Sequence, residues 1–153
     1  MLQVVAATVL FAVPIRFFGL KLPEPVFMMA PTFAWAMIRP SFLAPFGVLL
    51  MGLFLDVFWG GPIGLWGLSL LVAYGIVLLA RNMLAGQSKP MMWAWYVAAS
   101  GIAMVSAVLF TRLDVHASPS WIAVGWQLLA TAILYPFADR LIDRFEDADV
   151  RFR

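Results

Sequence analysis

Uncharged, apolar stretches alternate with short polar connections along nearly the whole chain, a pattern typical of a protein that crosses a membrane several times. The stretches predict six helices, over residues 1–20, 25–38, 42–58, 62–80, 91–111 and 121–138. A spanning helix takes about 20 residues, so six spans use most of the chain. The second stretch is short and contains Pro31, so a kinked helix and a re-entrant segment remain alternatives there.

Composition supports an all-α membrane protein. Of the 153 residues, 64% are hydrophobic and only 12% are charged, whereas soluble domains are about one quarter charged. Residues 1–138 are expected to form a six-helix transmembrane domain, and residues 139–153 a charged tail. Within that tail, Leu141, Ile142 and Phe145 predict one apolar stripe on a short surface helix.

Arginine and lysine are distributed unevenly between the two ends of the predicted spans. Positive residues favour the cytoplasmic side of a membrane, so the side that carries more of them is assigned to the cytoplasm, together with both termini. The cytoplasmic set is Arg39, Arg81, Lys89, Arg140, Arg144, Arg151 and Arg153. The opposite set is Arg16, Lys21 and Arg112.

Several classes of chemistry are excluded by the residue types present. The chain has no cysteine and one histidine, which rules out disulfides, thiol catalysis and metal sites built from several histidines. We therefore expect no metal and no cofactor, and the lack of a basic run argues against nucleic-acid binding. The residue types of a hydrolase triad occur at Asp114, His116, Ser118 and Ser120, but these residues crowd into one short loop without an orienting scaffold. We expect no enzyme.

The segment from Gly47 to Gly67 is the one around which the rest of the chain is organised. Small residues and one carboxylate recur there at intervals of four: Gly52, Asp56, Gly60 and Gly64. Since Gly60, Gly61 and Pro62 would break a helix, the segment predicts a helix, a turn and a second helix with Pro62 in its first turn. Gly52 would let a neighbouring backbone approach closely.

Asp56 is the only acidic residue within the predicted spans. An acid at bilayer depth is costly and normally has a partner or a function. Asp56 could relay protons or bind a cation, and it could equally accept backbone N–H groups at the start of the following helix or hold a neighbouring helix. Because proton pathways usually need several ionisable groups in series, the structural role is favoured.

The fifth predicted helix carries small residues at four-residue spacing, Ala99, Ala103 and Ala107. Such a stripe is typical of close helix packing in membranes. Together with the glycine-rich face around Asp56, it is a candidate surface for the membrane helix of a partner protein. Polar side chains are few in the spans, which makes a solute-binding pocket a weaker expectation.

With these features laid out, the chain resembles the rod shape-determining protein MreD family. A short second helix opens at Pro25 and ends in Trp35-Ala36-Met37-Ile38-Arg39-Pro40. There follow Gly47, Gly52-Leu53-Phe54-Leu55-Asp56, Gly60 and Pro62-Ile63-Gly64, and Leu134-Tyr135-Pro136 precedes the charged tail. The most specific part of the similarity is residues 39–64, and the rest consists mainly of hydropathy and spacing.

The resemblance implies a non-enzymatic scaffold in the bacterial inner membrane that acts in cell elongation and peptidoglycan synthesis. Its implied partners are an MreC-like protein, a RodA-type polymerase with its class B penicillin-binding protein, and membrane lipids. It also implies a six-helix fold related to the substrate-binding subunits of energy-coupling factor transporters. A small-molecule-binding subunit of a transporter is therefore the alternative function.

Overall fold

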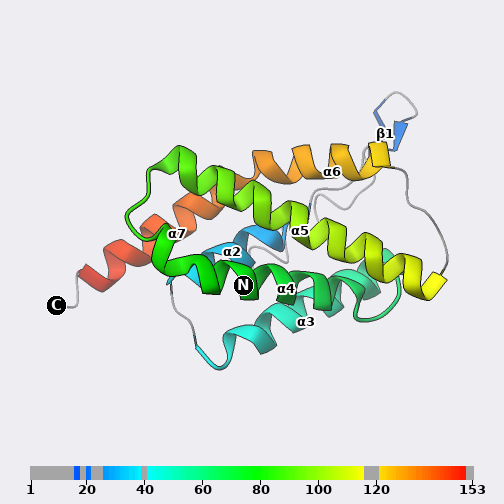
Figure 1. Cartoon of the computed structure of the whole chain (residues 1–153), viewed down its shortest axis with the longest axis horizontal. Coiled ribbons are helices and arrows are strands. Elements are labelled where there is room, and N and C mark those ends of the chain that lie inside the picture. The colour runs from blue at the N-terminus through cyan, green and yellow to red at the C-terminus, as the bar shows by residue number, and fades with distance from the viewer. Residues whose placement is uncertain (1–15, 18–19, 22–25, 39–40, 116–120, 151–153) are drawn as a thin grey trace.

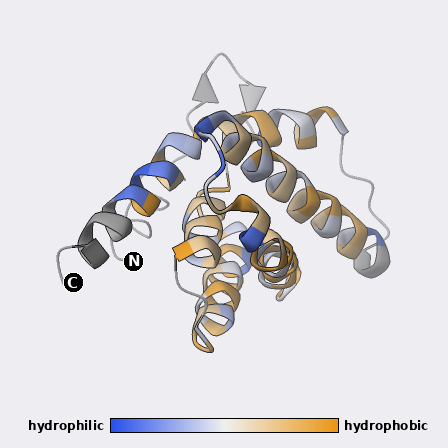
Figure 2. Ribbon diagram, turned by 60° about the vertical axis from the view of Figure 1, so that its left-hand side comes forward, coloured by the Kyte–Doolittle hydropathy of each residue, from blue (hydrophilic) through white to orange (hydrophobic). Residues whose placement is uncertain are grey.

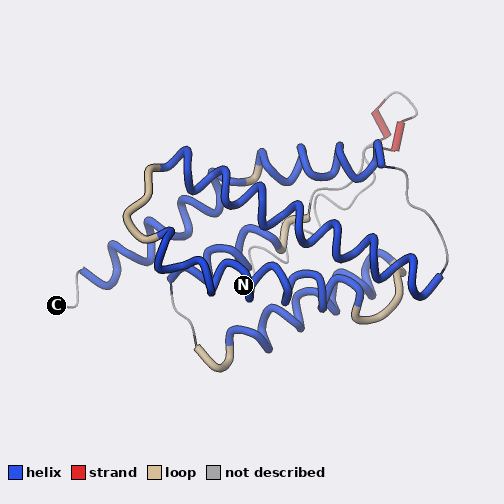
Figure 3. Tube along the Cα trace, viewed as in Figure 1, coloured by secondary structure: helices blue, strands red, loops and turns tan. Residues whose placement is uncertain are grey.

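The computed structural model describes residues 16–17, 20–21, 26–38, 41–115 and 121–150. Nearly all of these residues lie in helices that are gathered into one elongated bundle (Figures 1 and 3). The helices are α2 (Met29–Ile38), α3 (Ala44–Trp59), α4 (Leu65–Leu84), α5 (Lys89–Val115), α6 (Trp121–Ile133) and α7 (Tyr135–Val150). The helical class predicted from hydropathy and composition is confirmed for this part of the chain.

A short antiparallel ladder precedes the helices. Strand β1 (Arg16–Phe17) pairs with β2 (Leu20–Lys21), and Arg16 lies opposite Lys21. This corrects the prediction of a helix through residue 20, because hydropathy alone does not distinguish a strand from a helix over so few residues. Residues 1–15 of that predicted span lie outside the described residues.

Three helical segments of the described chain are long and apolar enough to cross a membrane: Leu65–Leu84, Lys89–Arg112 and Trp121–Asp143. Helix α3 has 16 residues and α2 only 10. At about 1.5 Å per residue, α2 is about 15 Å long, roughly half of the hydrocarbon thickness of a bilayer. The second predicted span is therefore a short helix, as its length and Pro31 suggested, and the helical part alone is shorter than a full span.

Helices α6 and α7 follow one another almost without a break, and Pro136 explains the interruption at Leu134. Proline has no backbone N–H, so Pro136 cannot donate to the carbonyl of Ala132 one turn earlier. The indole Nε1 of Trp93 on α5 donates to that carbonyl instead, at 3.2 Å. The break in the helix thus becomes a contact between helices.

Helix α2 lies in the middle of the bundle and touches α3, α4, α5 and α7 (Figure 1). Most of its side chains are buried, and Phe33 is completely so. The Phe33 ring meets the Tyr96 ring of α5 edge-on at 5.4 Å between centroids, and Tyr96 lies 5.6 Å from Tyr135 of α7. A helix that is apolar on all sides is typical of a core element.

Helix α7 contains the predicted tail boundary at residue 139 without ending there. It is the most hydrophilic helix in Figure 2, yet Ile142 is buried and Leu141 packs against the core. The tail is helical and apolar on one face, as predicted, but that face packs against α2 rather than lying free on a surface. The side chain of Phe145 lies outside the described part.

Candidate functional site

Helices α3 and α4 approach each other closely at two glycines. A Cβ atom built on Gly52 would collide with the Cα of Gly67 and would lie 2.5 Å from its nitrogen. Only a residue without a side chain permits this approach. The prediction that a backbone comes close at Gly52 is confirmed, and Gly67 is its partner.

Asp56 lies one turn after Gly52 and is completely buried. Its Oδ2 accepts the N–H of Gly64 at 2.8 Å, and its Oδ1 accepts the N–H of Trp66, also at 2.8 Å. The first N–H groups of a helix have no partner within the helix, and a carboxylate at this positive end is also favoured by the helix dipole. Asp56 thus acts as the N-terminal cap of α4 from a position on α3.

The backbone of Asp56 completes the turn. Its carbonyl accepts the N–H of Gly60, the residue that ends α3, and the N–H of Gly61 at 3.0 Å. Four backbone donors therefore converge on one residue. This confirms one of the alternatives that the sequence left open, the acceptance of backbone N–H groups at the start of the following helix.

Two glycines in the connection adopt left-handed backbone conformations, with φ of +64° at Gly60 and +98° at Gly64. Residues with a Cβ rarely adopt these angles, so both glycines are needed for the turn. The predicted helix, turn and helix are confirmed. Pro62, however, precedes α4 by three residues instead of lying in its first turn, since α4 begins only after Gly64.

The alanine stripe of α5 is already used inside the molecule. Ala99 and Ala103 are each 2% exposed, and Ala107 is 6% exposed. Close helix packing is confirmed, but the stripe is not a free surface for a partner, and the same holds for the face of Gly52. The prediction that these two surfaces bind a partner is therefore corrected. Their small residues are covered by neighbouring helices of this chain.

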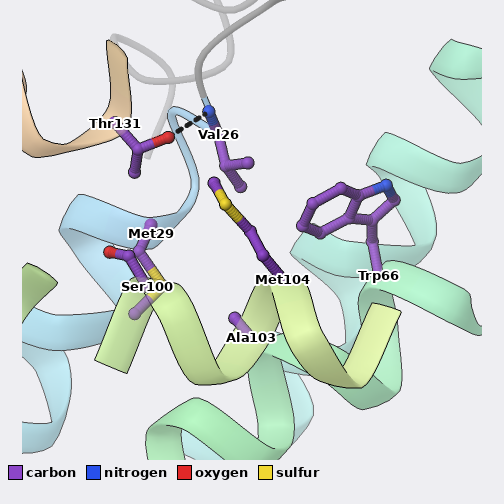
Figure 4. A pocket seen from close by; sticks show the side chains of 7 residues that line it. All are labelled: Val26, Met29, Trp66, Ser100, Ala103, Met104 and Thr131. Atoms are coloured by element: carbon purple, nitrogen blue, oxygen red, sulfur yellow. Dashed lines mark hydrogen bonds between the residues drawn. The ribbon is translucent and has the colours of Figure 1, made fainter. Parts of the chain in front are cut away.

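The buried hydroxyls of the bundle are satisfied locally, except that of Tyr96, which has no hydrogen-bond partner among the described residues. The others belong to serine and threonine. Each bonds to a backbone carbonyl four residues earlier: Thr32 to Met28, Ser69 to Leu65, Ser100 to Tyr96 and Thr131 to Gln127. Thr131 also accepts the N–H of Val26 at 3.1 Å (Figure 4). That bond ties the residues just before α2 to α6, and the sequence analysis did not anticipate it, because the pair is separated by 105 positions.

One hollow adjoins this contact, and a second shares Trp66 and Met104 with the first. The first is a crevice between Val26, Met29, Trp66, Met104 and neighbouring side chains, and it has no room for a water molecule (Figure 4). The second is a groove of about 160 Å³ between α4, α5 and α6. Ligand pockets for small molecules measure about 300 Å³ or more, so neither hollow has the size of a solute site.

Other residues that the sequence singled out contribute less. Arg39, Pro40, His116 and Ser118 lie outside the described residues, as does the side chain of Asp114. Among the described residues, no group of three or more histidine, aspartate or glutamate side chains is placed to hold a metal ion. Trp93 and Gly67 were missed because their partners lie on other helices, although Gly67 closes the segment that drew attention to Gly52.

Comparison with known proteins adds no relative to these observations. No known family, no curated protein and no solved structure matches the chain.

Proposed function

We propose that the chain is a non-enzymatic scaffold of the bacterial cell-elongation machinery and binds an MreC-like membrane protein. Through that protein, or directly, it would meet a RodA-type polymerase and its class B penicillin-binding protein. The proposal starts from the MreD-like motifs of residues 39–64. Its location is the inner membrane, and the three long apolar helical segments are consistent with an integral membrane protein.

The observation that carries the proposal is how the buried polar groups are used. Asp56 accepts backbone N–H groups with both carboxylate oxygens, and the buried serine and threonine hydroxyls bond to backbone carbonyls. Polar groups that act on a substrate have to face a cavity, whereas these hold helices together. Such a bundle is suited to presenting a rigid surface.

The alternative, a small-molecule-binding subunit of a transporter, finds less support. The larger of the two hollows measures about 160 Å³ and is lined mainly by apolar side chains. A vitamin-sized solute needs a pocket of about 300–1,000 Å³ with several convergent polar groups. The geometry of the described part therefore favours the scaffold.

The partner is expected on an outward apolar face, since the alanine stripe and the Gly52 face are buried. Helix α3 packs almost entirely on α4, so much of its circumference remains open. Its outer side carries Phe46, Leu50 and Val57, which are 65%, 66% and 73% exposed. We place the membrane helix of the MreC-like partner along this face.

A photo-crosslinking residue at Leu50 tests this placement in membranes that contain both proteins. Leu79 of α4 is a matched control, because it is also an exposed leucine, at 85%, but on another helix. A crosslink to the MreC-like protein from position 50 and none from position 79 is expected. Crosslinks from position 79 alone would show that the partner binds along α4 instead of α3. Failure of the unmodified proteins to co-purify in mild detergent would overturn the scaffold proposal.

We also propose six crossings with both termini in the cytoplasm. The support is the charge asymmetry of the sequence together with the grouping of basic residues in the bundle. Arg81 and Lys89 flank the connection between α4 and α5, and Arg112 lies near the other end of α5. The connection between α4 and α5 and the C-terminus lie at the same end of the molecule (Figure 1).

A further inference from the structure

The groove between α4, α5 and α6 is lined mainly by apolar side chains, and its polar lining residues are Thr111 of α5 and Gln127 of α6. Met104 and Val108 form apolar walls on α5, and Thr111 lies seven residues beyond Met104 on the same wall. Seven residues of helix rise by about 10 Å. The groove therefore extends for about this length toward the end of α5.

A cation lies beside the end of this groove at which Thr111 is found. Arg112 follows Thr111 directly, and its guanidinium carbon lies 5.5 Å from the centre of the Trp121 ring at the start of α6. The apolar segment of α5 ends at Arg112. An arginine and a tryptophan at the end of a span are typical of the headgroup level of a membrane, so the groove descends from that level into the hydrocarbon.

A groove with mainly apolar walls and a cation at its membrane-surface end suits one phospholipid in a leaflet. Half of a hydrocarbon core of about 30 Å is about 15 Å, and the groove follows about two thirds of that depth. Arginine is well suited to phosphate because its planar donors match the phosphate oxygens. We propose that the groove, with a volume of about 160 Å³, holds the upper part of one acyl chain of a phospholipid and that Arg112 pairs with its phosphodiester.

Specificity for the bound lipid has to come from the fit of its acyl chain to the groove, and not from apolarity alone. Lipid tails in the bilayer are as apolar as the groove, so transfer of a chain into it gains little from the hydrophobic effect. Close contact with the wall and the arginine–phosphate pair therefore distinguish the bound lipid from its neighbours. The inference is independent of the scaffold function, because it concerns only this chain and a lipid.

Native mass spectrometry of the full chain, purified in mild detergent and supplied with dioleoyl phosphatidylglycerol, tests the proposal. Val124→Trp should fill the groove from α6 and abolish retention of the lipid, because Val124 lies in its wall. Ile122→Trp makes a similar change on the same helix, but Ile122 is 74% exposed and does not line the groove. This control should retain one lipid as the unmodified chain does.

The charge is tested by Arg112→Gln, which should weaken retention about fivefold, as befits an ion pair at an exposed site. Arg81→Gln, in the last turn of α4, should leave retention unchanged. Dioleoylglycerol, which has the same chains and no phosphate, should bind less than the phospholipid. Equal binding of both lipids, or unchanged retention by Val124→Trp, would overturn the proposal.

Another occupant of the groove would be revealed by crosslinking. The chain has no cysteine, so a disulfide formed in membranes between Ala7→Cys and Val124→Cys would assign the groove to the apolar residues at the start of this chain. Such a result, like the absence of any retained phospholipid from the unmodified protein, would contradict the lipid assignment.

Discussion

Asp56 connects two helices through hydrogen bonds that only a carboxylate can make in full. Each of its two oxygens accepts one backbone N–H of the following turn and helix, from Gly64 and from Trp66. An amide offers one acceptor oxygen, and an aliphatic side chain offers none. The free-energy cost of burying this carboxylate is thus offset by the hydrogen bonds that it accepts.

Substitutions at Asp56 should therefore be graded. Asp56→Asn leaves one buried N–H without an acceptor and should lower the free energy of unfolding by about 1–3 kcal/mol. Asp56→Leu leaves both without one and should lower it further. Thermal unfolding in detergent and abundance in membranes measure the two effects. Equal damage from both substitutions would mean that the charge itself matters and would revive the proton-relay interpretation.

Gly52 should tolerate even the smallest side chain poorly. Gly52→Ala places a methyl group against the backbone of Gly67, so α3 and α4 must separate, at a cost of about 1–3 kcal/mol as in other overpacked cores. Gly75→Ala in α4 is the matched control, because a Cβ there meets no atom within 4 Å. Unfolding temperatures of the two variants provide the comparison, and equal temperatures would contradict the close contact.

At the scale of elements, α2 is shorter than the hydrocarbon core of a bilayer, and its position depends on its neighbours. It contacts α3, α4, α5 and α7, and just before it the N–H of Val26 is bonded to Thr131 of α6. A helix of ten residues is marginal in isolation. Its burial among longer helices, and not its own propensity, keeps it in place.

The bond between Val26 and Thr131 can be tested by comparing two threonines. Both Thr131 and Thr111 bond to carbonyls four residues earlier, but only Thr131 also accepts an N–H from another part of the chain. Thr131→Val should therefore destabilise the protein by about 1–3 kcal/mol more than Thr111→Val, since a buried N–H loses its acceptor. Chemical unfolding in mixed micelles measures the difference. If the two variants behave alike, Thr131 does not anchor α2.

At the scale of the whole molecule, charged groups gather where helices leave the apolar zone. The Lys89 ammonium lies 2.9 Å from the carboxylate of Asp139 and 3.3 Å from that of Asp143. The Lys89 side chain is 70% exposed, so solvent screens both pairs and they contribute little to stability. The pairs join the start of α5 to α7, and they leave the positive-inside count unchanged because acidic residues contribute little to orientation.

Topology is the corresponding prediction. Reporter fusions at Gly86, between α4 and α5, and after Arg153 should both report the cytoplasm, because these points follow an even number of crossings in the proposed arrangement. A fusion at Gly61 should report the opposite side. Reports from different sides at Gly86 and Arg153 would contradict the arrangement of α5, α6 and α7 in Figure 1.

The sequence by itself determined the helical class, the approximate bounds of α3 to α6 and the turn at residues 60–64. These features follow from local causes: hydropathy sets where a helix can lie in lipid, and glycine allows left-handed backbone angles. It also indicated that Asp56 and Gly52 are structural, since an acid and a missing side chain within an apolar segment each require a nearby explanation.

Only the tertiary structure decided which surfaces remain free. The alanines of α5 look equally suited to a partner or to the chain itself, and their burial shows that neighbouring helices of the chain occupy that face. The partners of Gly52, Thr131 and the Ala132 carbonyl also depend on folding. Periodicity identifies which residues share a face of a helix, but which helix covers that face is set by packing between segments far apart in the chain.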